Sequence, residues 1–360
     1  MSNIQKLSKE VKRRGLDAMM IHTNSRPNRR YLCGFSSSGG VLIVHKTGSA
    51  WLMIDGRYTE VAGRYAASHG YRMIGIAHDS EYNMQINSLC RDAGIKTLGF
   101  EDDITSVAMY SSLKKALTPE LKPAGGIVES WRQIKSRQEA DAILAAQRIA
   151  EAAFEDILSF IRPGVTERQV ANELTFAMYR RGADNLSFPV FSLSGPNSSM
   201  PHGVTGDRVI KAGDFLMLDF GVVKNGYYSD MTRTLAVGHA TDDMWEVYET
   251  VLQAQRLGIA AARAGATCHD IDAAARDYIE STKYKGQFLH LLGHGLGLSV
   301  AEAPYLEVGA HIPLNQGAVV TIEPGIYIPG KMGVRIEDML YVGCDAVENL
   351  THAPKELLVL

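Results

Sequence analysis

Two stretches of the chain, AGDFLMLDFGVV at residues 212–223 and QGAVVTIEPGIY at residues 316–327, share one pattern of glycine, apolar and acidic residues. When the two are aligned, Asp219 falls opposite Glu323, and a glycine follows each acid two residues later. A carboxylate inside an apolar run is strongly disfavoured unless it is paired or bound to a cation. The two stretches therefore indicate an internal repeat whose acids share a function.

The repeat continues on both sides of these stretches. Upstream, RPGVT at residues 162–166 and RAGAT at residues 263–267 each follow a long helical segment and open a second one. Downstream, YYSDMTRTLAV and GVRIEDMLYV match each other and place Asp230 opposite Glu337. Each half is expected to contain two helices and then strands that carry two acids. Two such halves around a pseudo-two-fold axis would bring four acids to one centre.

Four desolvated carboxylates need more positive charge than Arg233 and Arg335 can supply. For one acid alone, a buried salt bridge or a solvent-facing strand end would be the simpler interpretation. His294 stands between glycines in LLGHGLGLSVAEAP at residues 291–304 and adds one imidazole nitrogen. Oxygen ligands with one nitrogen favour divalent manganese, cobalt, iron or zinc. Two such ions about 3.5–4 Å apart can share a water, lower its pKa and present a hydroxide to a carbonyl carbon.

The N-terminal part of the chain has a different pattern, in which short apolar strands alternate with helical segments, including a hairpin around Thr47. A new segment begins near KPAGGIVESW. There, S-x-x-E from Ser136 and T-x-x-Q from Thr166 predict capping boxes for two helices. The chain is therefore predicted to hold one domain at residues 1–126 and a second at residues 127–360.

The composition limits the classes of protein to which the chain can belong. Hydrophobic residues make up 46% of the 360 residues and charged residues 21%, as in globular proteins with a sizeable core. The net charge of -3 gives no indication of a nucleic-acid or anionic-membrane partner. Neither a signal peptide nor an apolar run of about 20 residues is recognisable. The four cysteines are far apart and are expected to be reduced, so a cytoplasmic protein is predicted.

The motifs LDFG, YSDMTRT, GHGLG, TIEPGIY and RIED occur in this order and resemble those of the pita-bread metallopeptidases. That family includes methionine aminopeptidase, aminopeptidase P and prolidase. The first domain, with DGRYTEVA at residues 55–62, is similar to the creatinase-type N-terminal domain. The resemblance implies an α/β creatinase-like domain followed by an α+β pita-bread catalytic domain with a pseudo-two-fold repeat. The chain length resembles that of Xaa-Pro dipeptidases and short aminopeptidases P.

The resemblance also implies a role for each of the five metal ligands. Asp230 and Glu337 would bridge two divalent ions, and Asp219, His294 and Glu323 would be terminal ligands. Mn²⁺ is the expected ion, with Co²⁺, Zn²⁺ and Fe²⁺ as further candidates. Glu323 would also pass a proton from the bridging water to the leaving amine, which is general acid–base catalysis.

Three further residues match groups that surround the substrate in this family. His202 in SSMPHG would lie beside the substrate, His290 would lie near the prolyl pocket, and Arg335 would support the metal cluster. The implied substrate is a short peptide with proline at its second position, cleaved at the Xaa-Pro bond by a metal-bridging hydroxide. A homodimer in which the N-terminal domain closes the partner's cleft is also implied. The choice between dipeptidase and aminopeptidase depends on that closure.

One position departs from the family pattern. Where the pattern is GHGxGxxxHExP, this chain has GHGLGLSVAEAP, so Ala301 replaces a histidine while Glu302 and Pro304 are kept. In the family that histidine binds substrate and can donate a hydrogen bond to the developing oxyanion, and losing such a donor typically costs about 10²–10³ in rate. Four alternatives remain open. They are a peptidase that tolerates Ala301, a peptidase disabled by a change at this position, a non-peptidase hydrolase or lyase of small molecules, and a catalytically silent binding protein.

Overall fold

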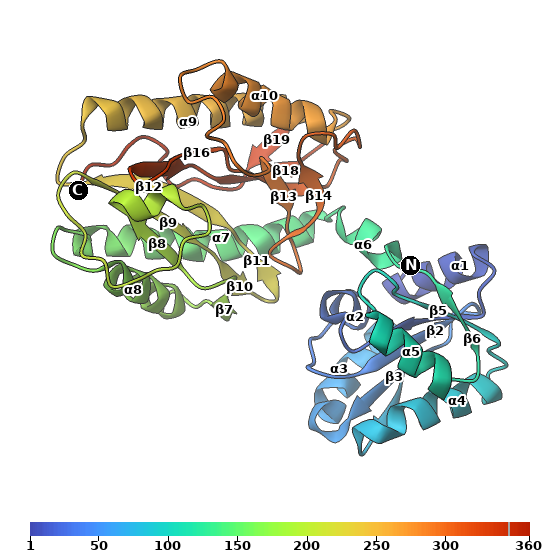
Figure 1. Cartoon of the computed structure of the whole chain (residues 1–360). Helices are drawn as coiled ribbons and strands as arrows, with labels where there is room; N and C mark the ends of the chain where they lie inside the picture. The colour runs from blue at the N-terminus through green and yellow to red at the C-terminus, as the bar shows by residue number, and fades with distance from the viewer. Residues whose placement is uncertain (345) are drawn as a thin grey trace. The chain divides into compact units, whose positions relative to one another are not determined.

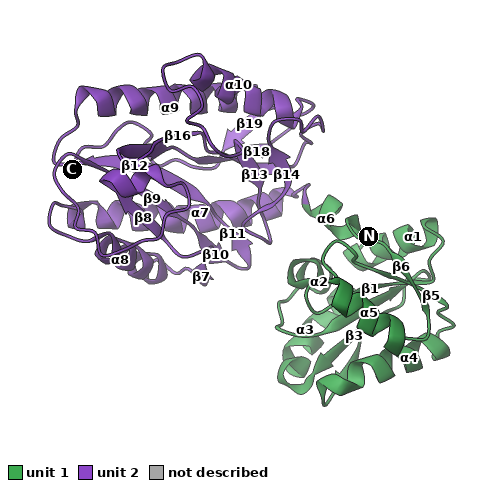
Figure 2. Cartoon of the chain, in the orientation of Figure 1, with its two compact units in different colours: residues 1–132 green, residues 133–360 purple. Residues whose placement is uncertain are grey.

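The computed structural model describes residues 1–344 and 346–360. It forms two compact units, residues 1–132 and residues 133–360 (Figure 2). Within the described ranges, every helix is too short or too polar to cross a bilayer.

The first unit is an α/β fold built on a six-stranded sheet. Its elements are α1 (Asn3–Arg13), β1 (Ala18–Ile21), α2 (Arg26–Cys33), β2 (Val41–His45), β3 (Ala50–Asp55), η1 (Gly56–Tyr58), α3 (Thr59–His69), β4 (Arg72–Ile76), η2 (Asp79–Glu81), α4 (Tyr82–Asp92), β5 (Thr97–Phe100), α5 (Val107–Ala116), β6 (Glu120–Pro123) and α6 (Ile127–Arg132). The strand order is β4-β3-β2-β1-β5-β6, and only β2 runs antiparallel to its neighbours. The predicted hairpin around Thr47 joins β2 and β3. Apolar cores on both faces explain why β2 is buried along its whole length.

The second unit contains the predicted repeat (Figure 1). Its elements are α7 (Arg137–Ile157), η3 (Leu158–Phe160), α8 (Glu167–Arg180), β7 (Asn185–Leu186), β8 (Phe191–Ser194), η4 (Gly195–Ser199), β9 (Asp214–Phe220), β10 (Val222–Lys224), β11 (Tyr227–Tyr228), β12 (Met231–Val237), α9 (Asp242–Ala261), α10 (Cys268–Glu280), β13 (Gly293–Gly295), β14 (Glu302–Leu306), β15 (Val319–Ile322), β16 (Gly325–Ile328), β17 (Met332–Arg335), β18 (Asp338–Val342) and β19 (Val347–Asn349). In the first half, α7 and α8 are followed by β9, the β10–β11 hairpin and β12. The second half repeats this order with α9, α10, β15, the β16–β17 hairpin and β18.

The helices of the two halves lie on opposite sides of the strands, α7 and α8 on one side and α9 and α10 on the other (Figure 1). Along β9, Leu216, Leu218 and Phe220 pack into the core formed with α7 and α8. Because successive strand residues point to opposite faces, this packing turns Asp219 away from that core and toward the second half. The alternation of apolar residues therefore decides where the acid points.

Both predicted capping boxes are present. The Ser136 hydroxyl accepts a hydrogen bond from the amide of Glu139, and the Glu139 carboxylate accepts one from the amide of Ser136. Thr166 and Gln169 form the same pair of bonds at the start of α8. These caps fix where the two helices of the first half begin.

Replacing Ser136 with alanine is expected to lower the free energy of unfolding of this unit by about 1 kcal/mol, because the cap satisfies a backbone donor at the start of α7. Urea denaturation should show a lower midpoint with an unchanged slope. The control is Ser281→Ala, which removes a hydroxyl that donates to the Tyr278 carbonyl at the end of α10. Its effect should stay below about 0.5 kcal/mol, and equal losses in both variants would contradict the assignment to capping.

Candidate metal centre

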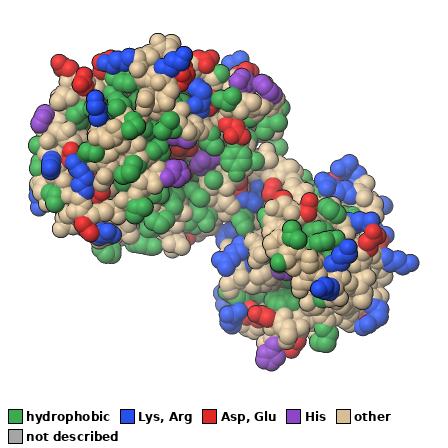
Figure 3. Space-filling view, in the orientation of Figure 1, with side chains coloured by type: hydrophobic (Ala, Val, Ile, Leu, Met, Phe, Trp, Pro, Cys, Tyr) green, Lys and Arg blue, Asp and Glu red, His purple; other side chains and the backbone are tan. Residues whose placement is uncertain are grey.

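The five side chains predicted as ligands lie together where the two halves of the repeat meet. Asp219 is near the end of β9, Asp230 directly precedes β12, and Glu337 directly precedes β18. Ligand oxygens of these three residues lie within 4.8 Å of one another. His294 in β13 brings its Nε2 to 3.7 Å from Asp230 Oδ2 and 3.5 Å from Glu323 Oε1. In Figure 3, histidine and acidic side chains gather among hydrophobic ones on the visible face of this unit.

Three of the carboxylates have a buried oxygen that accepts no hydrogen bond within the described chain: Asp219 Oδ1, Asp230 Oδ1 and Glu337 Oε1. A buried acceptor without a donor costs about 1–3 kcal/mol. Ionised carboxylates only accept hydrogen bonds, so these oxygens cannot satisfy one another. A set of hard oxygen ligands that face one another without donors fits a divalent cation.

The imidazole of His294 directs its Nε2 toward the same carboxylates. Its Nδ1 lies 3.0 Å from the carbonyl oxygen of Gly295, which can only accept, so Nδ1 carries the hydrogen. Nε2 of the neutral ring is then an acceptor that faces carboxylates, as in a metal ligand whose other nitrogen is fixed by a hydrogen bond. Gly293 is required beside it, because a Cβ there would overlap the carbonyl of Thr321. The glycines therefore allow the strand to approach closely.

Burial and mutual repulsion make these carboxylates resist ionisation in the metal-free protein. Burial, and then the neighbouring acids, raise the pKa of Asp230 and of Glu337 well above the usual range. Burial raises the pKa of Glu323 to about 7. Burial also raises the pKa of Asp219, although the nearby Arg335 opposes the shift. A divalent ion would compete with these protons, so its affinity should increase with pH.

Arg335 and His290 are joined through the buried hydroxyl of Tyr327, a residue that was not predicted from the sequence. Arg335 Nη1 donates to this hydroxyl at 2.9 Å, and His290 Nε2 lies 2.8 Å from it. Because His290 Nδ1 donates to the Leu291 carbonyl, its Nε2 accepts from Tyr327. Burial lowers the pKa of His290 to about 3, so this imidazole is neutral at physiological pH. In the sequence, Tyr327 lies within the TIEPGIY motif, four residues after Glu323.

Arg335 also connects carboxylates from both halves. Its Nη2 donates to Asp219 Oδ2 at 2.5 Å, and its Nε donates to the Thr232 hydroxyl at 3.0 Å. That hydroxyl in turn donates to Glu337 Oε2 at 2.7 Å. Thr232, which also was not predicted, lies in the YSDMTRT motif two residues after Asp230. Arg335 therefore contacts Asp219 directly and Glu337 through the Thr232 hydroxyl.

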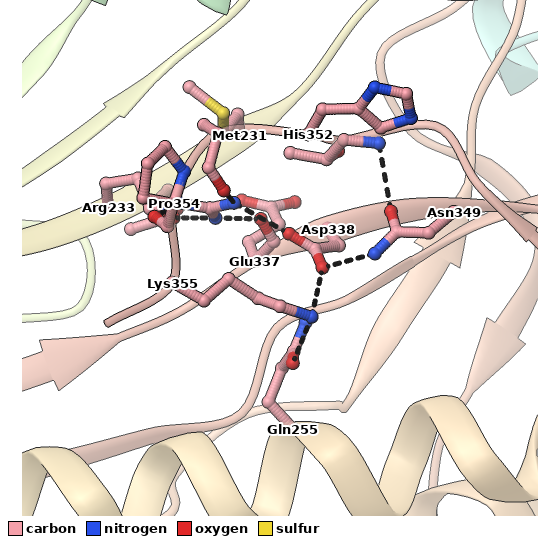
Figure 4. A network of polar contacts seen from close by, with 12 residues as sticks. Met231, Arg233, Gln255, Glu337, Asp338, Asn349, His352, Pro354 and Lys355 are labelled. Atoms are coloured by element: carbon pink, nitrogen blue, oxygen red, sulfur yellow. Dashed lines mark hydrogen bonds and ion pairs between the residues drawn. The ribbon is translucent and has the colours of Figure 1, made fainter. Parts of the chain in front are cut away.

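A second charged network contacts the backbone of Glu337 and the side chain of Asp338 (Figure 4). Arg233 donates to the backbone carbonyls of Glu337 at 2.6 Å and Thr232 at 3.0 Å, and to the carboxylate of Asp338 at 2.8 Å. Asp338 also accepts from Lys355 at 2.8 Å. Burial alone would raise the pKa of Asp338, but the charges of Arg233 and Lys355 lower it. Asp338 therefore neutralises the charge of Arg233. Arg233 holds the backbone carbonyls of Thr232 and Glu337, but it adds no net positive charge to balance the carboxylate cluster.

A cavity of about 430 Å³ opens onto the cluster. Its size is within the range of small-molecule sites. His202, His290 and Arg335 line it together with the five candidate ligands. The rest of the lining is largely apolar and consists of Phe188, Phe191, Pro201, Leu291, Val300, Ala301 and Tyr305. All the residues predicted to act in the site therefore border one cavity.

Known proteins match the chain along almost its whole length. Residues 141–343 match metallopeptidase family M24, and residues 3–134 match the creatinase/prolidase N-terminal domain. The chain is 33% identical to the Xaa-Pro dipeptidase of Pyrococcus furiosus over 99% of both proteins. Its structure is similar to that of the Xaa-Pro dipeptidase from Bacillus anthracis, with a TM-score of 0.94 and 41% identity over 99% of each chain. The X-Pro aminopeptidase from Thermotoga maritima MSB8 gives a TM-score of 0.92 and 30% identity over 100% of each chain.

These matches confirm the family and the fold class that were predicted from the motifs, a creatinase-like N-terminal domain followed by a pita-bread catalytic domain. The family and the carboxylate cluster together indicate a centre for divalent metal ions. The chain belongs to metallopeptidase family M24 and is an enzyme of the type with a creatinase/prolidase N-terminal domain.

Proposed function

We propose that this enzyme hydrolyses the Xaa-Pro bond at the N-terminus of dipeptides or short peptides. The observation that carries the proposal is the group of three buried carboxylate oxygens without donors, which borders a largely apolar cavity. The carboxylates suit metal-assisted attack on a carbonyl, and the apolar lining suits the ring of proline. Relatives along the whole chain length include proteins named Xaa-Pro dipeptidase and X-Pro aminopeptidase.

Two divalent ions, with Mn²⁺ expected first, would be held by five side chains. We assign Asp230 and Glu337 as bridging ligands, and Asp219, His294 and Glu323 as terminal ligands. The proximity of Asp219, Asp230 and Glu337 and the approach of His294 to Asp230 and Glu323 support this set of five residues. When bound, the ions would supply the nucleophile by lowering the pKa of a water that they share.

Glu323 is assigned the proton transfer. The bond before proline is a tertiary amide, so its nitrogen carries no hydrogen and needs a proton to leave as an amine. Glu323 would take a proton from the attacking water and pass it to this nitrogen. The Thr321 hydroxyl donates to Glu323 Oε1 at 2.9 Å and so fixes the orientation of the carboxylate.

The two histidines of the cavity are assigned to substrate binding. His202 reaches the cavity from the loop after β8 and would lie beside the peptide. His290 is neutral, is oriented by Tyr327, and would lie near the proline ring. Arg335 would not react but would keep Asp219 and Glu337 in place. A homodimer, which the family resemblance implies, is the expected assembly.

The proposed function is tested by release of alanine from Ala-Pro and Ala-Pro-Phe with Mn²⁺, after chelation and after metal is added back. Cleavage that depends on metal is expected for at least one of the two substrates. Ala-Ala and Ala-Ala-Phe, which lack proline, serve as matched controls and should be cleaved much more slowly. The preferred length then distinguishes a dipeptidase from an aminopeptidase. Metal binding without cleavage of either proline peptide would contradict the proposal and favour a non-peptide substrate.

Replacing Tyr327 with phenylalanine is expected to lower kcat/KM about tenfold, because the hydroxyl orients His290 and Arg335, and loss of such outer partners typically costs about 10–100-fold. The metal content per chain, measured by mass spectrometry, should change little. Tyr341→Phe is the matched control, since Tyr341 lies in β18 outside the cavity lining. An unchanged rate for Tyr327→Phe would show that the hydroxyl does not orient the site.

A further inference from the structure

The loop that carries His202 is held at both ends by one buried carboxylate, that of Glu167. Glu167 is the first residue of α8 and is fully buried. Its Oε1 accepts from the amide of Ser194 at 2.7 Å and from the Ser194 hydroxyl at 2.8 Å, at the start of the loop. Its Oε2 accepts from the amide of Gly206 at 3.3 Å, at the end of the loop. The side-chain amide of Asn197 donates to both oxygens, at 3.0 and 3.2 Å.

All of these donors are uncharged. Among the described residues, no lysine or arginine forms an ion pair with Glu167, and the neighbouring Arg208 is paired with Asp214. A buried carboxylate without a cation is costly unless charge-assisted hydrogen bonds compensate for its lost hydration. Here those bonds all connect α8 with the two ends of a single loop. The carboxylate therefore stabilises the closure of that loop.

The middle of the loop depends on these ends for its position. Met200 is 45% exposed and Val204 is 84% exposed, so the apex has little packing of its own. Pro201 and His202 lie between them and line the cavity. On the other side, the Ser198 hydroxyl accepts from the amide of Gly333 in β17, at 2.8 Å. The loop thus lies between α8 and the strand that ends in Arg335, with His202 directed into the cavity.

The second half of the repeat contains a comparable arrangement. Asp272 in α10 is fully buried, and its Oδ1 accepts from the amide of Leu292 at 3.2 Å. Arg276, which pairs with Asp272, donates to the carbonyl of His290 at 2.7 Å. In each half, a buried carboxylate on the second helix holds the segment that carries a histidine of the cavity. This recurrence indicates that the anchoring is related to the site and not only to local folding.

We propose that Glu167 is a positioning residue that holds the loop 194–206 closed, so that His202 faces the substrate. Its kinetic consequence rests on the function proposed above, whereas its effect on the loop does not. Glu167 does not border the cavity and acts only through His202. Changing Glu167 should therefore impair catalysis only while His202 is present.

A double-mutant cycle in the full-length, Mn²⁺-loaded enzyme tests this dependence. Glu167→Gln keeps the shape of the side chain but turns an amide group toward groups that donate, so one end of the loop loses its acceptor. It is expected to lower kcat/KM for the preferred proline peptide about tenfold. In a His202→Ala background the same change should cost less than about twofold. The control is Glu173→Gln on the same helix, where the carboxylate pairs with Arg180, and it should leave the rate unchanged.

Hydrogen exchange gives a readout that does not need activity. In Glu167→Gln, amides of residues 195–206 should exchange faster, while α8 and the metal content per chain stay as in the parent enzyme. Unchanged exchange in this loop, or full additivity of the two substitutions in the cycle, would overturn the proposal. Faster exchange in an enzyme that cleaves no proline peptide would instead leave the loop anchor in place and refute the proposed function.

A second variant covers the case in which Glu167→Gln does not fold. Asn197→Ala removes the donor shared by both carboxylate oxygens but leaves the buried carboxylate with its backbone partners. It should give the same changes on a smaller scale, about threefold in kcat/KM, and again only when His202 is present. No change in either the rate or the exchange of the loop would count against the anchoring role.

Discussion

Replacing Asp230 with asparagine is expected to lower metal-dependent activity by more than about 100-fold while making the metal-free protein more stable. Replacing a residue that only hydrogen-bonds to a metal ligand typically lowers metal affinity or activity about 10–100-fold. Asp230 is itself a proposed bridging ligand, so its loss should cost more. Its carboxylate approaches Asp219, Glu337 and His294, so it lies close to ligands from both halves of the repeat. The same closeness is unfavourable when no cation is bound.

The sign of the stability change follows from the pKa of Asp230, which burial and then Glu337, Asp219 and Glu323 raise well above the usual range. The folded metal-free protein therefore binds this proton more tightly than the unfolded chain does. The free energy of unfolding then falls as pH rises from the pKa of Asp230 in the unfolded chain toward its pKa in the folded protein. Above the folded pKa the whole loss of stability remains. Asparagine cannot ionise and removes this penalty.

Calorimetry with chelator and with Mn²⁺ measures both effects. Without metal, Asp230→Asn should melt above the parent enzyme at slightly alkaline pH. With Mn²⁺, the parent should gain stability through binding to the folded state, and the variant should gain little. A lower melting temperature of the variant in chelator would show that the carboxylate is not repelled by its neighbours.

Asp338→Asn provides a control of opposite sign one residue after Glu337. Asp338 is fully buried, but the charges of Arg233 and Lys355 lower its pKa. Removing its charge leaves Arg233 buried without its carboxylate partner, and breaking a buried pair typically costs about 3–5 kcal/mol. This variant should lose stability both with and without metal. Asp230 and Asp338 would then respond oppositely because Asp230 faces other carboxylates and Asp338 faces cations.

The sequence was most informative about the proposed metal ligands that stand at matching positions in the two halves of the repeat. Asp219 and Glu323 could be paired because each ends an apolar run and is followed two residues later by a glycine, and strand alternation in β9 then turns Asp219 toward the second half. Asp230 and Glu337 were paired in the same way, and the motif around His294 supplied the one nitrogen ligand, since glycines on both sides indicate close approach of the backbone. These features are encoded within a few residues of each acid.

The residues that sequence reasoning missed act through contacts between segments far apart in the chain. Tyr327 has the spacing of an ordinary strand residue, and its role appears only when β16 brings its hydroxyl between His290 and Arg335. Glu167 has the position of an exposed acid in the first turn of a helix, where such residues are common. Its burial depends on a loop that folds over it from residues 194–206. Neither fact follows from periodicity or from spacing.

Replacing Ala301 with histidine is expected to raise kcat about 100-fold, because a hydrogen-bond donor to a developing oxyanion is typically worth about 10²–10³ in rate. Ala301 is exposed and lines the cavity beside the metal cluster, so an imidazole can be added without repacking a core. The next residue, Glu302, forms an ion pair of 2.7 Å with Lys135 at the start of β14. The new side chain would therefore project into the cavity from the residue before β14.

The comparison that isolates the donor is Ala301→Phe, which adds a ring of similar size without a hydrogen-bonding group. A gain in kcat for histidine alone would show that the chain is a peptidase slowed at one position, with its metal centre otherwise complete. Equal gains for both variants would assign the effect to packing against the substrate. If neither changes kcat while the parent cleaves proline peptides at an ordinary rate, the oxyanion needs no donor at residue 301. The metal centre and the remaining groups of the cavity would then stabilise that charge without it.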